Sequence, residues 1–332
     1  MKRLDYIALL RALAIIIVVA FHVNCFMYGG CFPESQEAYK ETYFWFNQCL
    51  IINIAMPMFT FISGFLFNYL YSKGGKYRKF VQFAKNKFRR LWLPLIVFGS
   101  IFLVTTGNHD FYSLLVSCTY VHLWYLPVLF WCFIIAWLIL RYVPNRKYRL
   151  MLLPLFFVVA ALRLNLPYLF GIHGVPRWFW MFYMGIVFVD YEETISGAFK
   201  RFYLWIPFLA IFLFVTYSFP TEYDVVTLHK LLVAPLMMSS VWYLFSRIRN
   251  FDNIVCKALL NISRYSFGIY IFHIWIIMYC VCNTSKRIFS LPELAADHIF
   301  LFPTGLTVVV FGVSYLLTYL LLKTRAGRYL LG

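Results

Sequence analysis

The chain has 332 residues, of which 63% are hydrophobic and 13% charged, and its formal net charge is +17. Soluble domains are typically about 45–50% apolar and about 25% charged, so the composition excludes an ordinary soluble protein. Apolar stretches recur from one end of the sequence to the other and leave no room for a separate soluble domain. We therefore expect one polytopic membrane domain over residues 1–332.

Ten apolar segments are expected to cross the bilayer, for which spans of about 20 residues suffice. They are residues 5–28, 44–71, 91–107, 122–142, 150–166, 176–191, 202–219, 228–246, 262–283 and 298–322. Several contain proline, which bundled membrane helices tolerate. The predicted fold class is thus an all-α integral membrane protein, a bundle of about ten transmembrane helices.

The lysines and arginines are distributed unevenly over the connecting segments. With the N-terminus inside, the inner segments carry 22 of the 30 basic residues and the outer segments carry six. Cytoplasmic loops are enriched in Lys and Arg, so we expect both termini to be cytoplasmic, in a cell's inner membrane. The basic charge then reflects topology and contact with membrane lipids, and it predicts no nucleic-acid partner.

Two ionisable side chains interrupt the first apolar segment, Arg11 and His22. Eleven helical steps return to within about 20° of the start, so the two residues share a face about 16 Å apart along the axis. An arginine within a span costs about 2.5 kcal/mol or more, which favours a polar or water-filled interior. The alternatives are that Arg11 snorkels to the inner headgroups and that His22 is a helix-packing histidine.

The longest inner loop, SKGGKYRKFVQFAKNKFRR, contains no acidic residue and ends at Arg90. Its apolar residues fall on one helical stripe, so we expect an amphipathic helix at the membrane surface. The loop would be attracted to anionic lipid. The cluster Lys87, Arg89 and Arg90 would also suit a phosphate-bearing cytoplasmic ligand, and the two interpretations are compatible.

Few other polar groups occur in apolar surroundings. Candidates for lining a polar cavity are Ser63, His122, Trp124, Tyr125, Tyr265, Tyr270 and His273. Helix packing would explain Ser63, and aromatic belts would explain Trp124 and Tyr125. A single cavity containing His22, His122 and His273 is a hypothesis that periodicity permits. The eight cysteines show no metal-ligand spacing and are interpreted as small hydrophobes, so no metal site is predicted.

Several motifs together resemble a known family. The first segment, RLDYIALLRALAIIIVVAFH, has an arginine, ten intervening residues and a histidine, as in the first helix of the membrane acyltransferase-3 family. The later motifs FISGF, KFRRLWLP, HLWYLPVL and SRYSFGIYIFH resemble that family's signatures in its order. The resemblance runs from residue 3 to about residue 320.

The resemblance implies transfer of an acyl group, with acetyl as the first expectation, from cytoplasmic acyl-CoA to a hydroxyl of a glycan or glycolipid. Acyl-CoA would be a co-substrate, and no permanently bound cofactor is implied. His22 would be the catalytic histidine, Arg11 its partner, and the basic loop the donor-binding segment. The family usually has Arg-x-x-Arg at this loop, whereas Lys87 occupies the first position here. Lysine lacks the bidentate guanidinium fork.

The chemistry of acyl transfer from a thioester to an alcohol requires a base and stabilisation of an oxyanion. Histidine titrates near neutrality and suits the first task. The sequence contains no readable Cys-His or Ser-His-Asp arrangement, so we favour direct attack by the acceptor hydroxyl over an acyl-histidine relay. Two rival classes stay open: an exporter or flippase of polysaccharide or lipid-linked sugar, and a non-catalytic partner in envelope-glycan assembly.

Overall fold

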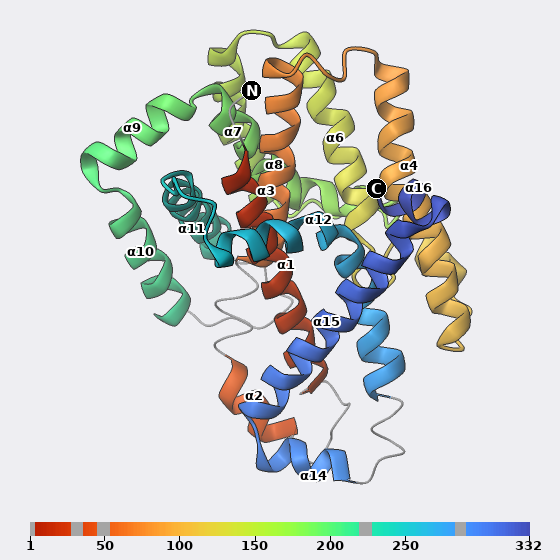
Figure 1. Cartoon of the computed structure of the whole chain (residues 1–332). Helices are drawn as coiled ribbons and strands as arrows, with labels where there is room; N and C mark the ends of the chain where they lie inside the picture. The colour runs from red at the N-terminus through yellow and green to blue at the C-terminus, as the bar shows by residue number, and fades with distance from the viewer. Residues whose placement is uncertain (1–3, 28–35, 45–53, 219–227, 283–289) are drawn as a thin grey trace. The chain divides into compact units, whose positions relative to one another are not determined.

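A computed structural model describes residues 4–27, 36–44, 54–218, 228–282 and 290–332 (Figure 1). Within these ranges the chain forms helices and no strand, in agreement with the predicted all-α class. Contacts divide the chain into two compact units. Unit 1 comprises residues 1–7, 57–212 and 227–247, and unit 2 comprises residues 8–56, 213–226 and 248–332.

Unit 1 takes most of its residues from the middle of the chain. It contains all or most of α3 (Ala55–Asn68), η5 (Tyr69–Lys73), α4 (Phe80–Thr105), α5 (Phe111–Leu115), α6 (Tyr125–Tyr142), α7 (Arg146–Ala161), η6 (Ile172–Gly174), α8 (Val175–Asp190), α9 (Glu192–Phe202), α10 (Trp205–Ser218) and α11 (Leu228–Ser246). The core of the unit is α8, whose residues are mostly buried and which packs against α6 and α7. Because α8 is apolar on all sides, it belongs in the interior of a helix bundle.

Two glycines bring α3 and α8 into close contact. A Cβ atom on Gly64 would lie 1.8 Å from the carbonyl oxygen of Phe182, and one on Gly185 would lie 2.2 Å from that of Phe61. No side chain fits at such distances, so the two backbones approach each other directly. Small residues serve this purpose at helix interfaces in membranes. The helix-packing interpretation of the Ser63-Gly64 pair therefore holds for Gly64.

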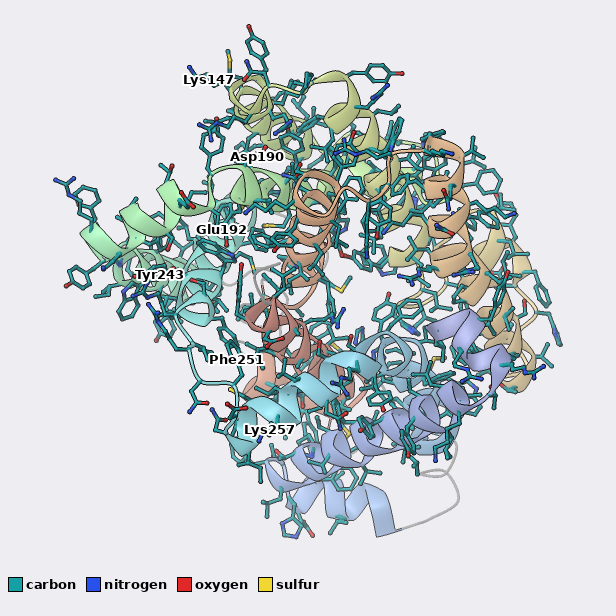
Figure 2. All side chains as sticks on the ribbon, turned by 45° about the horizontal axis from the view of Figure 1, so that its top comes forward. Lys147, Asp190, Glu192, Tyr243, Phe251 and Lys257 are labelled. Carbon is teal, nitrogen blue, oxygen red and sulfur yellow. The ribbon has the colours of Figure 1, made fainter. Side chains whose placement is uncertain are left out.

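A buried polar network connects the ends of three helices in unit 1. Nε of Arg149 donates to Oδ2 of Asp190 at 2.7 Å, and Nδ2 of Asn68 donates to Oδ1 of the same carboxylate at 2.9 Å. Figure 2 labels Asp190, at the end of α8, and Glu192, at the start of α9. Glu192 accepts a hydrogen bond from the Lys73 ammonium at 3.1 Å. The bonds to Asp190 satisfy charged groups that would otherwise be costly to bury, whereas the pair of Lys73 and Glu192 is partly exposed.

Unit 2 combines the N-terminal helix with the C-terminal part of the chain. It contains all or most of α1 (Asp5–Phe26), α2 (Gln36–Phe44), α12 (Ile254–Trp275), η7 (Ile276–Cys282), α14 (Ser290–Asp297), α15 (Leu301–Lys323) and α16 (Arg325–Leu331). Helix α12 packs along α15. At Gly268 a Cβ atom would lie 2.3 Å from Cγ2 of Thr318, so this glycine lets the two helices come close.

Each of the ten predicted spans contains a described helix. Among the described residues, four helices are long and apolar enough to cross a membrane, namely α1, α4, α6 and α15. The pair α9 and α10 makes a fifth if its bend of 83° lies within one span. The chain is therefore a membrane protein that is helical over the ranges described, and the ten-span count and the placement of both termini stay predictions.

The basic loop differs from its prediction. We expected a surface helix separate from a span beginning at residue 91, but α4 runs without a break from Phe80 to Thr105. The reason lies in its packing, because Phe83 and Leu91 are both buried and so carry one packed face across the predicted boundary.

The cysteines also differ in part from their interpretation as small hydrophobes. Cys25, Cys118, Cys132 and Cys256 are free thiols. Cys282 is disulfide-bonded, so the interpretation was wrong for that residue. Cys49 lies outside the described residues.

Candidate active site

Helix α1 places Arg11 and His22 on one face, as the spacing predicts. It is continuous from Asp5 to Phe26, so the eleven-residue interval corresponds to about three helical turns. Ile15 and Val18, between them on the same stripe, are buried at 0% and 1% exposure. Arg11 and His22 are themselves only half-buried. A packed stripe with a partly accessible polar group near each end is the first element of the candidate site.

Arg11 is held by the side chain of Ser263, on α12. Its Nε donates to Oγ of Ser263 at 2.9 Å. The backbone carbonyl of Ser263 in turn accepts from Oγ of Ser266 at 2.9 Å. The contact uses Nε only, so the two terminal amino groups of the guanidinium keep the geometry that suits a bidentate anionic ligand.

His22 is in contact with His273, also on α12. Nδ1 of His22 lies 2.9 Å from the carbonyl oxygen of Val18 and 3.2 Å from Nε2 of His273. Nδ1 of His273 lies 3.0 Å from the carbonyl oxygen of Ile269. The ring centroids of the two histidines are 5.0 Å apart, and His273 is fully buried. Two imidazoles are thus paired inside unit 2.

The two contacts show that α1 and α12 run in the same direction. Arg11 pairs with Ser263 and His22 pairs with His273, so residue numbers increase together along both helices. A parallel pair is what the ten-span topology requires of its first and ninth spans, since both cross the membrane in the same sense. The intervals of eleven and ten residues keep both contacts in register over about three turns.

The basic cluster of α4 lies in unit 1 and is not uniform. The ammonium of Lys87 lies 3.3 Å from the ring centroid of Phe133, with the rings of Tyr77 and Phe83 at 5.4 and 5.9 Å. Such cation–π contacts are favourable, above all where water is excluded. Arg90 is exposed and Arg89 half-buried. The lysine is therefore held among aromatic rings, while Arg90 remains accessible.

The other candidate residues belong to different environments. In unit 1, Tyr125 shares a hydrogen bond of 3.0 Å with Thr60, and Trp124 packs against Trp178 with ring centroids 5.8 Å apart. Ser63 is half-buried and His122 is buried, both also in unit 1. These contacts fit helix packing, and of the candidate residues only His273 has a described hydrogen bond to His22.

The two remaining candidates lie on α12 with His273. The ring of Tyr270 is 6.0 Å from that of His273, so it borders the histidine pair. The ring of Tyr265 instead packs against Tyr315 and Tyr319 of α15, with centroids 4.8 and 6.0 Å away. Tyr265 therefore contributes to the packing of α12 on α15.

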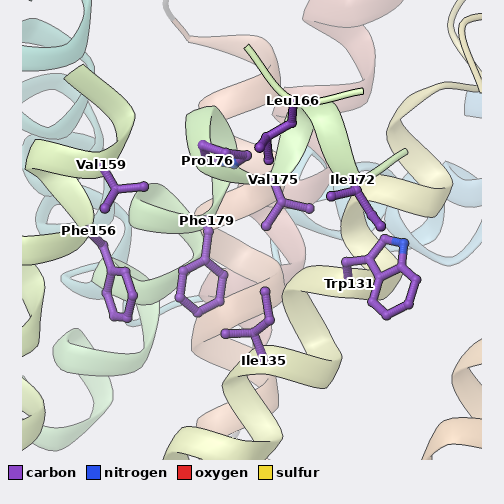
Figure 3. Close-up of a pocket in the computed structure, with 9 residues that line it drawn as sticks. All are labelled: Trp131, Ile135, Phe156, Val159, Leu166, Ile172, Val175, Pro176 and Phe179. Carbon is purple, nitrogen blue, oxygen red and sulfur yellow. The ribbon is translucent and has the colours of Figure 1, made fainter. Parts of the chain in front are cut away.

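An apolar cavity of about 350 Å³ lies among α6, α7 and α8 in unit 1 (Figure 3). It is lined by Trp131, Ile135, Phe156, Val159, Leu166, Ile172, Val175, Pro176 and Phe179. None of these was a predicted site residue, and their side chains suit a hydrocarbon chain rather than acid–base chemistry. His173 follows Ile172, and burial lowers the pKa of that histidine. In the ranges described, no three His, Cys, Asp or Glu side chains converge as metal ligands would.

Ser263 is the site residue that the sequence prediction missed. A usable signal was present, since Ser263 precedes His273 by ten residues much as Arg11 precedes His22 by eleven. Two helices with polar groups at nearly equal intervals can meet at both positions if they are parallel. Serine alone in an apolar helix is common, however, and only the matched spacing singles it out.

The family model described as an acyltransferase domain matches residues 4–323, nearly the whole chain. No curated protein and no solved structure gives a significant match. The matched range includes both Arg11 and His22 and the basic cluster of α4. The chain therefore belongs to the membrane acyltransferase-3 family, whose activity requires an acyl donor and an acceptor.

Proposed function

We propose that this membrane acyltransferase moves an acyl group, in the first instance acetyl, from cytoplasmic acyl-CoA to a hydroxyl of a cell-envelope polysaccharide or lipid-linked sugar. It would act in the inner membrane with both termini cytoplasmic. The observation that carries the proposal is the pair Arg11 and His22 on one stripe of α1, each hydrogen-bonded to α12. The family membership supplies the reaction class, and these residues supply its chemistry.

His22 is the base in this proposal. Its two hydrogen bonds to described residues use Nδ1, so Nε2 is the nitrogen that meets the acceptor hydroxyl. Nε2 removes the hydroxyl proton as the oxygen attacks the carbonyl carbon of the thioester. The tetrahedral intermediate then expels the CoA thiolate, which takes the proton back from His22. A base so placed contributes about 10²- to 10⁴-fold to the rate.

Arg11 acts on the donor rather than on the reacting carbonyl. It is about 16 Å from His22 along the helix, too far for both side chains to touch the same carbonyl. The flexible arm of an acyl-CoA carries amide and phosphate groups along its length. A guanidinium fixed by Ser263 at this position can hydrogen-bond such groups as the arm passes.

The phosphates of the donor bind the basic cluster of α4. Arg90 is exposed and can form a bidentate contact, and Arg89 adds a second guanidinium next to it. Lys87 contributes positive charge and is held by Phe133, so it supports the site rather than gripping a phosphate. This assignment agrees with the family's usual arginine being replaced by lysine at that position.

The test is transfer of label from radioactive acyl-CoA to endogenous acceptors. Membrane vesicles containing the protein are given labelled acetyl-CoA, and label is measured in the glycan and lipid fractions against vesicles lacking the protein. Protein-dependent label in either fraction supports the proposal. Export of glycan without any acylated product would instead favour the exporter or flippase alternative.

A further inference from the structure

The hydrogen bonds around the histidine pair determine which nitrogens carry protons. A carbonyl oxygen can only accept, so Nδ1 of His273 must donate to Ile269 and Nδ1 of His22 must donate to Val18. In the neutral rings, Nε2 of each histidine then carries a lone pair. The distance of 3.2 Å between Nδ1 of His22 and Nε2 of His273 is therefore a hydrogen bond in which His22 donates. The same N–H also donates to the Val18 carbonyl, so the bond has two acceptors.

We infer that His273 is a positioning residue for acyl transfer, which accepts a hydrogen bond from His22 and keeps Nε2 of His22 as the basic nitrogen. The inference rests on the proposed function of His22. It adds a role for a buried residue that touches neither substrate, since His273 is fully buried on α12 and acts only through His22.

The contribution of His273 grows during the reaction. When Nε2 of His22 takes the hydroxyl proton, the ring becomes an imidazolium, and its Nδ1–H becomes a charged donor. Hydrogen bonds to charged groups are shorter and about twice as strong as those between neutral groups. The lone pair on His273 thus stabilises the charged form of His22 more than the neutral form, which is the condition for catalysis rather than binding alone.

A backbone hydrogen bond within α12 determines which nitrogen of His273 carries the lone pair. Nδ1 of His273 is occupied by the carbonyl of Ile269, one turn earlier on α12, which prevents the ring from presenting an N–H to His22. A hydrogen bond from one ring nitrogen to a backbone carbonyl commonly fixes the tautomer of a functional histidine. The parallel packing of α1 and α12, fixed at its other end by Arg11 and Ser263, keeps the two rings in register.

Three substitutions at position 273 separate this role from packing. In His273→Gln, the side-chain carbonyl oxygen reaches about as far as Nε2 and can accept from His22, so most of kcat should remain. In His273→Asn the oxygen falls short, and in His273→Leu no acceptor is left. For these two variants kcat should fall about 10- to 150-fold, the rate equivalent of one hydrogen bond to a charged group, with KM for acyl-CoA unchanged.

The matched control is Ile274→Val, a buried packing change at the next residue of α12. It should leave kcat near the wild-type value. Equal loss of kcat in the Gln, Asn and Leu variants would overturn the inference, because it would show that only the shape of the histidine matters. Wild-type kcat in His273→Leu would overturn it as well.

Imidazole nitrogen NMR on the protein with isotope-labelled histidine gives a second measurement that does not depend on activity. The expected spectrum has Nδ1 protonated and Nε2 unprotonated in both rings, and the Nε2 signal of His273 should move in His22→Gln. A proton on Nε2 of His273 would overturn the inference. If these signals are as expected but the wild-type protein transfers no acyl group, the proposed function fails while the pairing stands.

Discussion

The basic residues of α4 differ in how freely their side chains can reach a ligand. Lys87 lies against Phe133 and is anchored, whereas Arg90 is exposed and Arg89 half-buried. An ammonium held 3.3 Å from a ring centroid has less freedom to follow a phosphate than an exposed guanidinium. The two arginines are therefore the residues on which donor affinity should depend.

Replacing Arg89 and Arg90 together with alanine should raise KM for acyl-CoA. A well-formed charge-assisted contact to a phosphate is worth about 1.5–3 kcal/mol, so the loss of even one corresponds to about a tenfold change or more. The measurement is KM for acyl-CoA in vesicles with equal amounts of inserted protein. The control is Lys85→Ala, which removes an exposed charge from the same helix.

If the Lys85 variant raises KM as much as the double arginine variant does, the cluster acts through general basic charge. In that case its role is attraction to anionic lipid rather than recognition of the donor. An unchanged KM in the double variant would lead to the same conclusion.

At this scale the sequence predicts local geometry and little else. The shared face of Arg11 and His22 follows from the period of one helix, and α1 confirms it. The partner of His22 could not be predicted, because His273 is 251 residues away and its contact depends on how α1 and α12 pack. The ring that holds Lys87 was missed for the same reason, since Phe133 lies on α6. The catalytic and binding roles of these residues stay predictions.

At the scale of helices, α3 and α8 of unit 1 are in close backbone contact. Gly64 of α3 and Gly185 of α8 approach the backbone of the opposite helix to distances that exclude a Cβ atom. Van der Waals packing of this kind is a principal source of helix association in membranes, where burial of apolar surface gives little.

Gly64→Ala and Gly185→Ala should each destabilise unit 1. Overpacking costs about 1–3 kcal/mol, and a contact with backbone rather than with a flexible side chain leaves little room for relief. The measurement is the thermal unfolding midpoint of the detergent-solubilised protein. In the control Gly197→Ala nothing lies within 4 Å of the added Cβ, and alanine is the better helix former, so stability should be unchanged or higher. Unchanged stability in both test variants would contradict the close contact of α3 and α8.

The sequence predicts a helix boundary well where neighbouring residues mark it. It predicts a boundary poorly where packing against other helices determines how far the helix extends. The sequence predicts the beginning of α1 to the residue, since its apolar run starts beside the basic N-terminus. It predicts a break between a surface helix and the third span near residue 91, because the preceding residues are basic, whereas α4 is continuous from Phe80 to Thr105. Buried Phe83 extends the packed face of that helix through the charged region, which no local pattern shows.

For the whole molecule, the charge bias predicts which connecting segments face outward. In a background without native cysteines, Gln36→Cys, Asn108→Cys and Asp224→Cys should each be labelled from outside by a reagent that does not cross membranes, and Lys76→Cys should not. The measurement is labelling in intact cells compared with permeabilised cells. Inside-only labelling at any of the first three positions would contradict the ten-span topology.

Family membership makes the protein a membrane acyltransferase, and the mechanism that we propose for it uses His22, which is in contact with α12, as the base. His22→Gln keeps a hydrogen-bonding side chain of similar reach but has no basic nitrogen. It therefore removes the proposed chemistry while preserving most of the packing around α1. Comparison of this variant with the wild type tests the mechanism of the whole molecule.

The direct measurement is incorporation of acyl label from acyl-CoA into glycan and lipid by membranes containing equal amounts of wild-type and His22→Gln protein. The variant should lose most of the about 10²- to 10⁴-fold rate contribution of a general base, without loss of protein from the membrane. Label incorporation by His22→Gln at the wild-type rate would contradict the mechanism and reduce His22 to a packing residue.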